Sequence, residues 1–396
     1  MYLLHIIGSM DPISGGPAQG IRNSNFEMQK LGVYREVVSL DDPKSDFIGS
    51  DDFIIHALGP AKGPWRYSPK LIPWLAANLG RFDVVIINGL WLFSSYAGWK
   101  TLHQLDKRPN TLKWFVMPHG MLDPYFQRAP QRKFKAIRNW IYWKFIEKRI
   151  VNESDGLLFT CETELELARQ SFRPYHPKRE LNIGYGIMPP PVFLPEMNKA
   201  FQEKCPELKE SPYLLFFSRI HKKKGLDLLI RGYAAHLDRA LKEGYSIPKL
   251  VIAGPGLQTT FGENIKKMVC KTPELQSSVY FSGMLSGNEK WGALYGCDAF
   301  ILPSHQENFG IAVVEALSCG KPVLISNKVN IWKEIASAGA GIISNDTFDG
   351  VMEMLESWLN LSHEYRTSMG IKARETYKSN FDSIPISKKL FEALIS

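Results

Sequence analysis

The feature that most constrains the fold of this chain is a repeated alternation of short apolar runs with amphipathic segments of helix length. This alternation is typical of a doubly wound parallel sheet, in which a helix follows each strand and packs on a sheet face. It predicts strands at 2–7, 35–39, 83–87, 113–117 and 156–159, and again at 213–217, 249–253, 279–281, 299–302 and 322–325. It predicts helices at 19–31, 93–105, 129–150 and 162–171, and again at 225–242, 262–271, 286–295, 311–319 and 349–359.

A chain of 396 residues is too long for one hydrophobic core, so the sequence favours two domains. The segment 182–196 is rich in Pro and Gly, which interrupt both periodicities, and we place the linker there. We therefore expect an N-terminal α/β domain at 1–190 and a second at 191–379. The segment 380–396 is expected to carry a last helix back onto the first domain. Open parallel sheets bind ligands at the carboxyl ends of their strands, which predicts a cleft between the two sheets.

The net charge of +8 and a pI near 9.0 favour an anionic partner. No nucleic-acid-binding motif is present, so we expect no nucleic acid and favour a small polyanion or a membrane surface. No apolar run reaches the length of a transmembrane helix, and the first residues lack the basic region of a signal peptide. The odd number of cysteines, with no CxxC pair, favours a reducing compartment. We expect a cytoplasmic protein, with the inner face of the cytoplasmic membrane as a second option.

The strongest motif is SHQENFGIAVVEALSCGKPVL at 304–324, where a predicted strand is followed by a polar loop and a helix. A helix that begins near Gly310 points free amide N–H groups at an anion. Glu307 precedes this helix and Glu315 lies inside it, so the two carboxylates could bind hydroxyls on either side of a diphosphate. The alternative is that Glu307 only interacts with the helix dipole and Glu315 is a solvated helix residue.

A second motif, YLLFFSRIHKKKGLDLLIRGY at 213–233, leads from a strand through a basic turn into a helix. Arg219 offers a planar fork for phosphate oxygens, and Lys224 offers a compact positive charge. A solvated basic turn is the alternative, and it explains Lys222 and Lys223 better than it explains Arg219, which directly follows the strand.

Two weaker signals follow strands of the first domain. Gly15 and Gly16 allow the backbone to approach a ligand, although a plain turn is equally consistent with them, and the loop matches no dinucleotide or ATP motif. His119 follows the strand at 113–117 and is a candidate ligand contact. The run 88–91 could line an acceptor site or pack in the core. The chain has no Asp-x-Asp pair, so we expect neither a metal ion nor a cofactor.

Together, these motifs resemble the retaining glycosyltransferases of family four over nearly the whole chain. The resemblance implies the GT-B fold, with two facing Rossmann-like domains and an interdomain cleft. It implies that Glu307 binds the 3- and 4-hydroxyls of the donor sugar, that Glu315 binds the ribose, and that Arg219 and Lys224 neutralise the diphosphate. It places His119 near the 6-position of the sugar.

The resemblance also implies main-chain contacts with the donor. The main chain of Gly16 would cover the phosphates, and that of Met284 would meet the base. Gly254 lies in the Gly-rich turn of the family. The rest of the nucleotide site would be Gly15 and the run Asn308, Phe309, Gly310 and Ile311. One departure is the linker sequence Gly-Tyr-Gly-Ile at 184–187, where the family usually has Pro-Asn-Gly-Val.

The PHGMLDP string at 118–124 is similar to bacterial, especially cyanobacterial, exopolysaccharide enzymes. The resemblance implies transfer of a hexose, and glucose from UDP-glucose is the first choice because it is the commonest donor of such enzymes, with GDP-mannose second. The acceptor would be a saccharide or a polyprenyl-diphosphate-linked saccharide. Because Glu307 is assigned to hydroxyls, no carboxylate nucleophile remains, which favours same-face attack. The alternatives are a nucleotide-sugar epimerase or hydrolase of the same fold, and a pure nucleotide-sugar binding protein.

The segment 127–151 interleaves basic residues with Trp, Tyr and Phe and is predicted to be helical. Such a helix can lie on an anionic membrane surface and bring the enzyme to a lipid-linked acceptor. The alternative is a core helix whose apolar face packs on the sheet and whose basic face is solvated.

Overall fold

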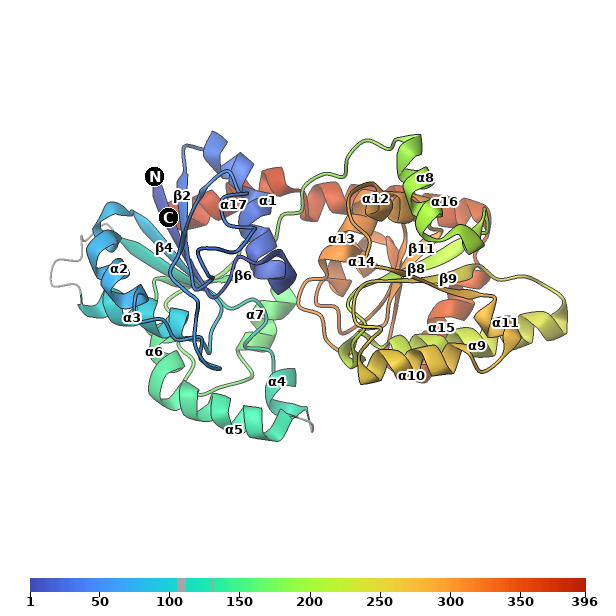
Figure 1. Cartoon of the computed structure of the whole chain (residues 1–396), viewed down its shortest axis with the longest axis horizontal. Coiled ribbons are helices and arrows are strands. Elements are labelled where there is room, and N and C mark those ends of the chain that lie inside the picture. The colour runs from blue at the N-terminus through green and yellow to red at the C-terminus, as the bar shows by residue number, and fades with distance from the viewer. Residues whose placement is uncertain (105–111, 130–131) are drawn as a thin grey trace. The chain divides into compact units, whose positions relative to one another are not determined.

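The computed structural model describes residues 1–104, 112–129 and 132–396. The chain forms two compact units, one made of residues 1–188 and 383–396 and the other of residues 189–382 (Figure 1). The expected division at 190 and 191 lies two residues from the first crossing between units, and the return to the first unit occurs at 383 rather than 380.

The described part of the first unit contains a seven-stranded sheet in the order β3-β2-β1-β4-β5-β6-β7, and its paired neighbours are parallel. Its strands are β1 (Tyr2–Ile7), β2 (Tyr34–Ser39), β3 (Ile54–Ala57), β4 (Val84–Asn88), β5 (Lys113–Met117), β6 (Gly156–Phe159) and β7 (Glu180–Asn182). The central strand β4, with sequence VVIIN, is buried along its whole length, as expected for a parallel strand covered on both faces.

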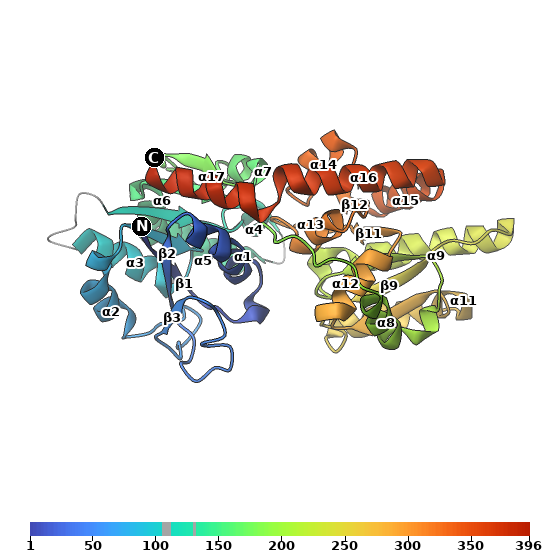
Figure 2. The ribbon, with the colours of Figure 1, turned by 90° about the horizontal axis from the view of Figure 1, so that it is seen from above.

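Helices cover both faces of this sheet (Figure 1). They are α1 (Gly16–Lys30), α2 (Leu71–Asn78), α3 (Phe93–Gln104), α4 (Tyr125–Arg128), α5 (Lys133–Tyr142), a π-helical turn (Trp143–Glu147), α6 (Lys148–Glu153), α7 (Glu162–Ala168) and α17 (Ser383–Ile395), with 3-10 turns at Pro12–Ser14 and Leu79–Arg81. Figure 2 shows α17 lying beside α1. Its Leu390 and Leu394 belong to a buried cluster with Leu3 of β1 and Met28 of α1, so α17 completes the core of the first unit.

The second unit contains a six-stranded parallel sheet in the order β10-β9-β8-β11-β12-β13. Its strands are β8 (Tyr213–Phe217), β9 (Lys249–Ala253), β10 (Val279–Gly283), β11 (Ala299–Leu302), β12 (Val323–Ser326) and β13 (Gly341–Ser344). Its helices are α8 (Pro195–Lys204), α9 (Leu226–Glu243), α10 (Thr260–Val269), α11 (Pro273–Gln276), α12 (Gly287–Gly296), α13 (Ile311–Ser318), α14 (Trp332–Ala338), α15 (Phe348–Leu359) and α16 (His363–Asn380), with 3-10 turns at Pro206–Leu208 and Lys222–Lys224. Both sheets confirm the predicted doubly wound α/β class.

The chain reverses its winding direction at the centre of each sheet. In the first unit this topological switch lies between β1 and β4, and in the second it lies between β8 and β11. Loops that follow two such strands run to opposite faces of the sheet, which leaves a crevice at the carboxyl ends of the strands where ligands bind. Among the described residues, no helix combines the length and the apolar character needed to cross a membrane.

The helix expected over 129–150 begins later than predicted. Ala129 has ψ 122 and is extended, because a residue that precedes proline is driven out of the helical region, and residue 130 is proline. Helix α5 begins only at Lys133, and the helical backbone continues through a π-helical turn into α6, which ends at Glu153. Residues 105, 130 and 131 of the expected helices lie outside the described residues.

Candidate functional site

In the second unit, the loops that follow β8 and β11 are packed together at the topological switch. Gly225 has φ 66, and a Cβ atom there would lie 2.0 Å from the carbonyl oxygen of Pro303, so only glycine permits this approach. The amide of His305 donates to the carbonyl of Lys223 over 2.7 Å. The sequence motifs at 213–233 and 304–324 therefore form one structure.

Lys224 and Glu307 form an ion pair across this junction, from Lys224 Nζ to Glu307 Oε2. Their side chains are 13% and 21% exposed, so solvent screens the pair less than it screens a surface salt bridge. Beside it, Lys223 Nζ donates to Gln306 Oε1. The structure thus brings together two residues that sequence reasoning assigned to the same ligand.

The backbone of Glu307 is also fixed. Its amide donates to the carbonyl of Lys328 over 2.9 Å, and its carbonyl accepts from the amide of Asn330 over 3.0 Å. Asn330 Nδ2 reaches Asn308 Oδ1 at 3.4 Å. The segment after β12 therefore supports the Glu307 loop, a connection that no local sequence pattern indicates.

Arg219 is exposed at the start of the same turn, and among the described residues neither a hydrogen bond nor an ion pair occupies its guanidinium. The pKa of His221 is lowered by burial and by the charges of Arg219, Lys223 and Lys224. A neighbouring imidazole therefore experiences the positive potential of this turn. Such a potential attracts an anionic ligand.

Helix α13 begins directly after the Glu307 loop. Gly310 is its N-cap, with φ 84, and no described residue accepts a hydrogen bond from the amides of Gly310, Ile311 or Ala312. Phe309 is buried and packs edge-on against Phe381, with ring centroids 5.7 Å apart, which holds the start of the helix in place. Free amides at a helix N-terminus form an anion-binding arrangement beside the basic turn.

Glu315 lies within α13, and its Oε1 accepts from Lys290 Nζ of α12 over 2.9 Å. The two side chains are 14% and 22% exposed. Glu315 is therefore an ion-paired, partly buried residue rather than the solvated helix residue of the alternative interpretation.

The loops after β9 and β10 lie against the loop after β8. A Cβ atom on Gly254, which has φ 127, would lie 2.1 Å from the carbonyl oxygen of Ser218. The amide of Gly254 donates to the carbonyl of Gly283 over 2.7 Å. Met284 follows, and its side chain is 60% exposed. The structure thus links the backbone before Arg219 to the backbone before Met284.

In the first unit, Gly15 has φ 88 and its Cβ position is open space, while Gly16 begins α1. The carbonyl of Gly16 accepts a hydrogen bond from the Tyr185 hydroxyl. The Tyr185 ring also fills the space that a side chain at Gly20 would need. Tyr185 of the unusual linker sequence thus fixes the start of α1, a support that could not be predicted from the linker sequence alone.

His119 lies at the carboxyl end of β5 with φ 52, in the left-handed region that non-glycine residues rarely adopt. Its Nε2 is 3.1 Å from Oδ1 of Asn88, the last residue of β4. Burial lowers the pKa of His119 to about 4, so the ring is neutral at pH 7. Asn88 is thus engaged with a candidate site residue, rather than only packed in the core.

Two buried carboxyl groups support the loops that follow β4 and β5. Glu164 of α7 accepts from the amide of Gly120 and from the amide and hydroxyl of Thr160. Glu147, in the π-helical turn, accepts from the amide of Trp91 over 2.8 Å, and burial raises its pKa to about 8. Neither acid was identified from the sequence, because each stands in a predicted helix with nothing nearby to mark it.

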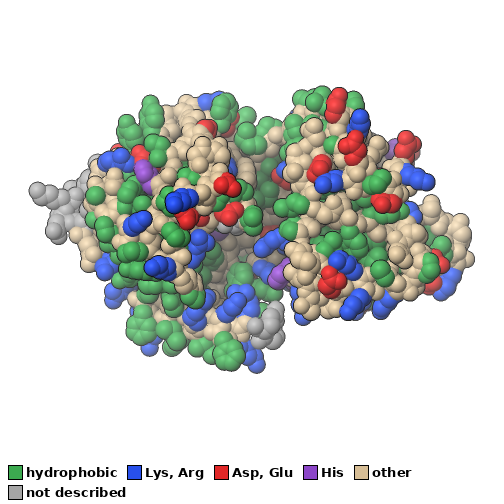
Figure 3. Space-filling model, in the orientation of Figure 1, with side chains coloured by type: hydrophobic (Ala, Val, Ile, Leu, Met, Phe, Trp, Pro, Cys, Tyr) green, Lys and Arg blue, Asp and Glu red, His purple; other side chains and the backbone are tan. Residues whose placement is uncertain are grey.

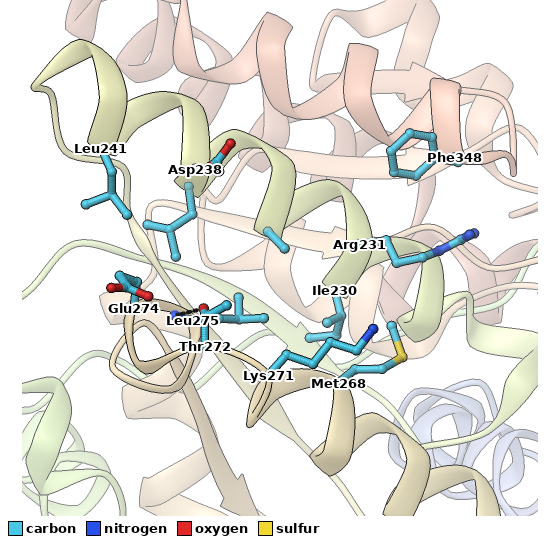
Figure 4. A pocket seen from close by; sticks show the side chains of 12 residues that line it. Ile230, Arg231, Asp238, Leu241, Met268, Lys271, Thr272, Glu274, Leu275 and Phe348 are labelled. Carbon is cyan, nitrogen blue, oxygen red and sulfur yellow. Dashed lines mark hydrogen bonds between the residues drawn. The ribbon is translucent and has the colours of Figure 1, made fainter.

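The cavity drawn in Figure 4, about 700 Å³ in volume, lies elsewhere in the second unit. Its walls come from residues 230–241 of α9, from the segment 268–275 and from Phe348. None of the candidate site residues lines it. The candidate site is therefore defined by its residues at the strand ends and not by the volume of a cavity.

Helix α5 presents large apolar side chains to solvent. Phe134 is 90% exposed, and Ile137, Trp140 and Ile141 are also exposed, as is Phe145 in the π-helical turn that follows. Figure 3 shows hydrophobic and basic side chains next to one another along the edge of the unit that α5 forms. Asn139 is the buried residue of α5. Further along the segment, Trp143, Ile150 and Val151 are buried in the core of the first unit, so the core-helix alternative holds for that part and not for α5.

No group of three or more metal-ligating side chains occurs within residues 1–104, 112–129 and 132–396. The ion pairs Lys224–Glu307 and Lys290–Glu315 instead join a lysine to a carboxylate. The chemistry that these residues offer is the binding of an anion by cations and amides, with carboxylates beside it that can accept hydrogen bonds from hydroxyls.

Comparison with known proteins identifies the family. Residues 15–181 match a family model described as a glycosyl transferase 4-like domain, and residues 198–376 match one described as glycosyl transferases group 1. A GDP-mannose:cellobiosyl-diphosphopolyprenol alpha-mannosyltransferase from Komagataeibacter xylinus is 23% identical over 357 residues, which cover 87% of this chain and 80% of the relative. Four further curated relatives are matched over 30% to 48% of their own length.

Solved structures show the same fold. Anabaena HepE in complex with UDP-glucose has a TM-score of 0.75 at 14% identity, with 100% of this chain and 99% of HepE covered. Sucrose-phosphate synthase from Thermosynechococcus elongatus has a TM-score of 0.71 at 18% identity, with 99% and 98% covered. The two family models together span most of the chain, and the chain belongs to the glycosyltransferases of family four, enzymes with the GT-B fold.

Proposed function

We propose that this enzyme is a retaining hexosyltransferase that moves glucose from UDP-glucose to a saccharide or a polyprenyl-diphosphate-linked saccharide in exopolysaccharide synthesis. The observation that carries the proposal is the junction of Lys224 with Glu307 at the switch point of the second sheet, with Arg219 on the same turn. A cation paired with a carboxylate suits a ligand that has a diphosphate next to sugar hydroxyls.

Arg219, Lys224 and the free amides at the start of α13 stabilise the nucleoside diphosphate as it departs. Fixed donors of this kind act where charge develops and need no reorganisation during the reaction. The protein itself supplies the positive charge, so we propose that transfer needs no metal ion or other cofactor. Unchanged turnover after treatment with a chelator is the expected result, and loss that added Mg²⁺ restores would contradict it.

The remaining candidate residues orient the donor. Glu307 accepts hydrogen bonds from the 3- and 4-hydroxyls of the sugar through the oxygen that Lys224 leaves available, and Glu315 binds the ribose in the same way. His119 contacts the 6-position of the sugar. The main chain of Gly16 covers the phosphates, and the main chain at Met284 reads the base.

We propose same-face attack, in which the leaving phosphate accepts the proton of the acceptor hydroxyl. The bond from the anomeric carbon to the diphosphate breaks as the bond to the acceptor oxygen forms, and the diphosphate leaves with its electron pair. A double displacement would need a carboxylate nucleophile, and Glu307 is paired with Lys224. Intact-mass spectrometry should find no glycosyl-enzyme adduct, and a trapped adduct would refute the mechanism.

The choice of UDP-glucose is supported by the likeness to HepE, which was solved with that donor. GDP-mannose is the second candidate, because it is part of the name of the mannosyltransferase from Komagataeibacter xylinus. Thermal unfolding in the presence of UDP and of GDP distinguishes the two candidate donors, because a ligand at 100 times its Kd stabilises the folded state by about 2.7 kcal/mol. Donor consumption that requires an added sugar acceptor supports a transferase, whereas consumption without one indicates a hydrolase or an epimerase.

The exposed face of α5 supports a location at the inner face of the cytoplasmic membrane, where a polyprenyl-linked acceptor lies. Phe134 of α5 and Phe145 of the adjoining π-helical turn are exposed and stand among basic residues, and the sequence from 126 to 146 contains no Asp or Glu. Burial of a Phe side chain in the interface contributes about 1.5–3 kcal/mol, and each basic residue near an anionic surface adds about 1 kcal/mol.

Co-sedimentation with vesicles of anionic phospholipid tests this location. The wild type should bind at low salt, and Phe134→Ala with Phe145→Ala should reduce binding at least tenfold. Phe26→Ala is the matched control, since Phe26 is 52% exposed on α1 and lies outside this face. Absence of binding by the wild type, or equal losses in control and test variants, would contradict the proposal.

A further inference from the structure

Asn88 connects two histidines inside the first unit. It ends β4, which lies between β1 and β5 in the sheet, and it is buried together with His5 of β1. Its Nδ2 lies 3.1 Å from Nδ1 of His5, and its Oδ1 lies 3.1 Å from Nε2 of His119. The three side chains therefore form one hydrogen-bonded row across the sheet.

The backbone determines which way the amide of Asn88 faces. Nδ2 lies 3.2 Å from the carbonyl oxygen of Ile86 and 3.5 Å from that of Ile6. Carbonyl oxygens can only accept hydrogen bonds, so the amide nitrogen must face them, and the opposite orientation would place oxygen against oxygen. The amide oxygen of Asn88 consequently faces His119.

This orientation determines the tautomer of His119. Because an amide oxygen can only accept, His119 must carry its proton on Nε2. The ring is neutral at pH 7, since burial lowers its pKa to about 4, and Nδ1 is then a hydrogen-bond acceptor. Among the described residues, no hydrogen bond occupies this nitrogen, and it is not one of the buried side-chain atoms that lack a partner. It is therefore accessible to a ligand.

The position of the ring is fixed as well as its protonation. The left-handed backbone of His119 is followed by Gly120, with φ 77, whose amide donates to Glu164. A buried carboxylate thus holds the turn, while Asn88 holds the ring. A non-glycine residue in the left-handed region costs about 1–2 kcal/mol, and it persists where surrounding contacts determine it.

We propose that Asn88 is a positioning residue that fixes His119 as the Nε2–H tautomer, so that Nδ1 accepts a hydrogen bond from the 6-hydroxyl of the donor sugar. This inference rests on the proposed function for the placement of the sugar. It assigns a specificity-determining role to Asn88, because a donor without that hydroxyl leaves Nδ1 unpartnered, and a site built around such a bond discriminates against that donor.

The tautomer can be measured without a donor. Long-range ¹H–¹⁵N correlation spectra of ¹⁵N-histidine-labelled protein distinguish the two nitrogens, and comparison with His119→Gln assigns the signal. We expect the Nε2–H tautomer in the wild type and a mixture in Asn88→Ala. A wild-type spectrum with the proton on Nδ1 would overturn the proposal.

The donor selectivity of Asn88→Ala tests the specificity-determining role of Asn88. UDP-xylose lacks the C6 hydroxymethyl group of UDP-glucose, so the ratio of the two kcat/KM values isolates that group. Asn88→Ala should lower kcat/KM at least tenfold with UDP-glucose and less than threefold with UDP-xylose. Equal losses with both donors would mean a merely structural role and would overturn the inference.

His5→Phe is the matched control. It removes the far histidine of the row, while Ile6 and Ile86 still orient Asn88, so the selectivity ratio should stay within twofold of the wild type. If Asn88→Ala does not fold, Asn88→Ser serves for the same comparison. If the wild type uses neither UDP-sugar, the proposed donor fails, while the tautomer measurement still decides the role of Asn88.

Discussion

Gly225→Ala provides a direct test of the junction between the basic turn and the Glu307 loop. Gly225 is the N-cap of α9, and Gly244 is the C-cap of the same helix, with φ 66 and 77. Alanine in this region costs about 1–2 kcal/mol at either position. The environments differ, because a Cβ at Gly225 would lie 2.0 Å from the Pro303 carbonyl oxygen, whereas nothing lies within 4 Å of one at Gly244.

Relief of that contact requires a shift of roughly 1 Å, because real Cβ atoms essentially never approach another atom within 3.0 Å. Since Lys224 is the preceding residue, the shift separates it from Glu307, and a misplacement of about 1 Å can cost about 100-fold in rate. We therefore expect Gly244→Ala to lose about 1–2 kcal/mol of unfolding free energy with kcat/KM unchanged.

Gly225→Ala should lose about 2–5 kcal/mol, since overpacking adds roughly 1–3 kcal/mol to the backbone term. Its kcat/KM should fall about 100-fold. Urea denaturation gives the unfolding free energies, and initial rates give kcat/KM. Equal destabilisation of the two variants, or wild-type activity in Gly225→Ala, would refute the argument that this close approach sets the position of Lys224.

Three further predictions follow from the site and its supports. Arg219→Ala should reduce turnover about 100-fold and leave the fold intact, since its side chain is exposed; an effect below threefold in initial-rate assays would exclude its assigned role. Met284→Ala should change the Kd of the nucleoside diphosphate less than threefold in calorimetry, because we assign recognition of the base to the main chain; a larger change would show that the side chain takes part. Folded Glu147 has a pKa raised from 4.5 to about 8, so between these values it is protonated when folded and ionised when unfolded. The wild type should therefore lose up to about 1.4 kcal/mol of this group's contribution per pH unit as pH rises through that window. Urea unfolding at pH 5 and pH 8 should show a smaller fall for Glu147→Gln, and identical falls would disprove the assignment.

The strands that could be predicted from the sequence are those buried on both faces. The predicted bounds at 113–117 and 213–217 coincide with β5 and β8, because continuous apolar runs mark such strands. The strands β3, β7 and β13 were missed. Their residues are mostly half-buried and mixed in polarity, so neither an apolar run nor an alternation distinguishes them from a loop.

The candidate site, too, could be predicted from the sequence only in part. The turn at 219–225 and the loop at 304–310 are each recognisable, because chain order and local pattern place them after strands. Their contact depends on β8 and β11 being neighbours, which only the sheet order reveals. The roles of Asn88, Tyr185 and Glu164 depend on partners 31, 169 and 44 residues away in the sequence, and no local pattern encodes such distances.

The return of α17 to the first unit has a consequence for synthesis on the ribosome. Leu390 and Leu394 cover Leu3 and Met28, so the unit that begins at residue 1 keeps part of its core uncovered until residues 383–396 have been made. The second unit is continuous from 189 to 382 and has all its own strands before that point. During translation, the second unit can therefore complete its core first, and the first unit must wait in an open state that exposes apolar surface to chaperones.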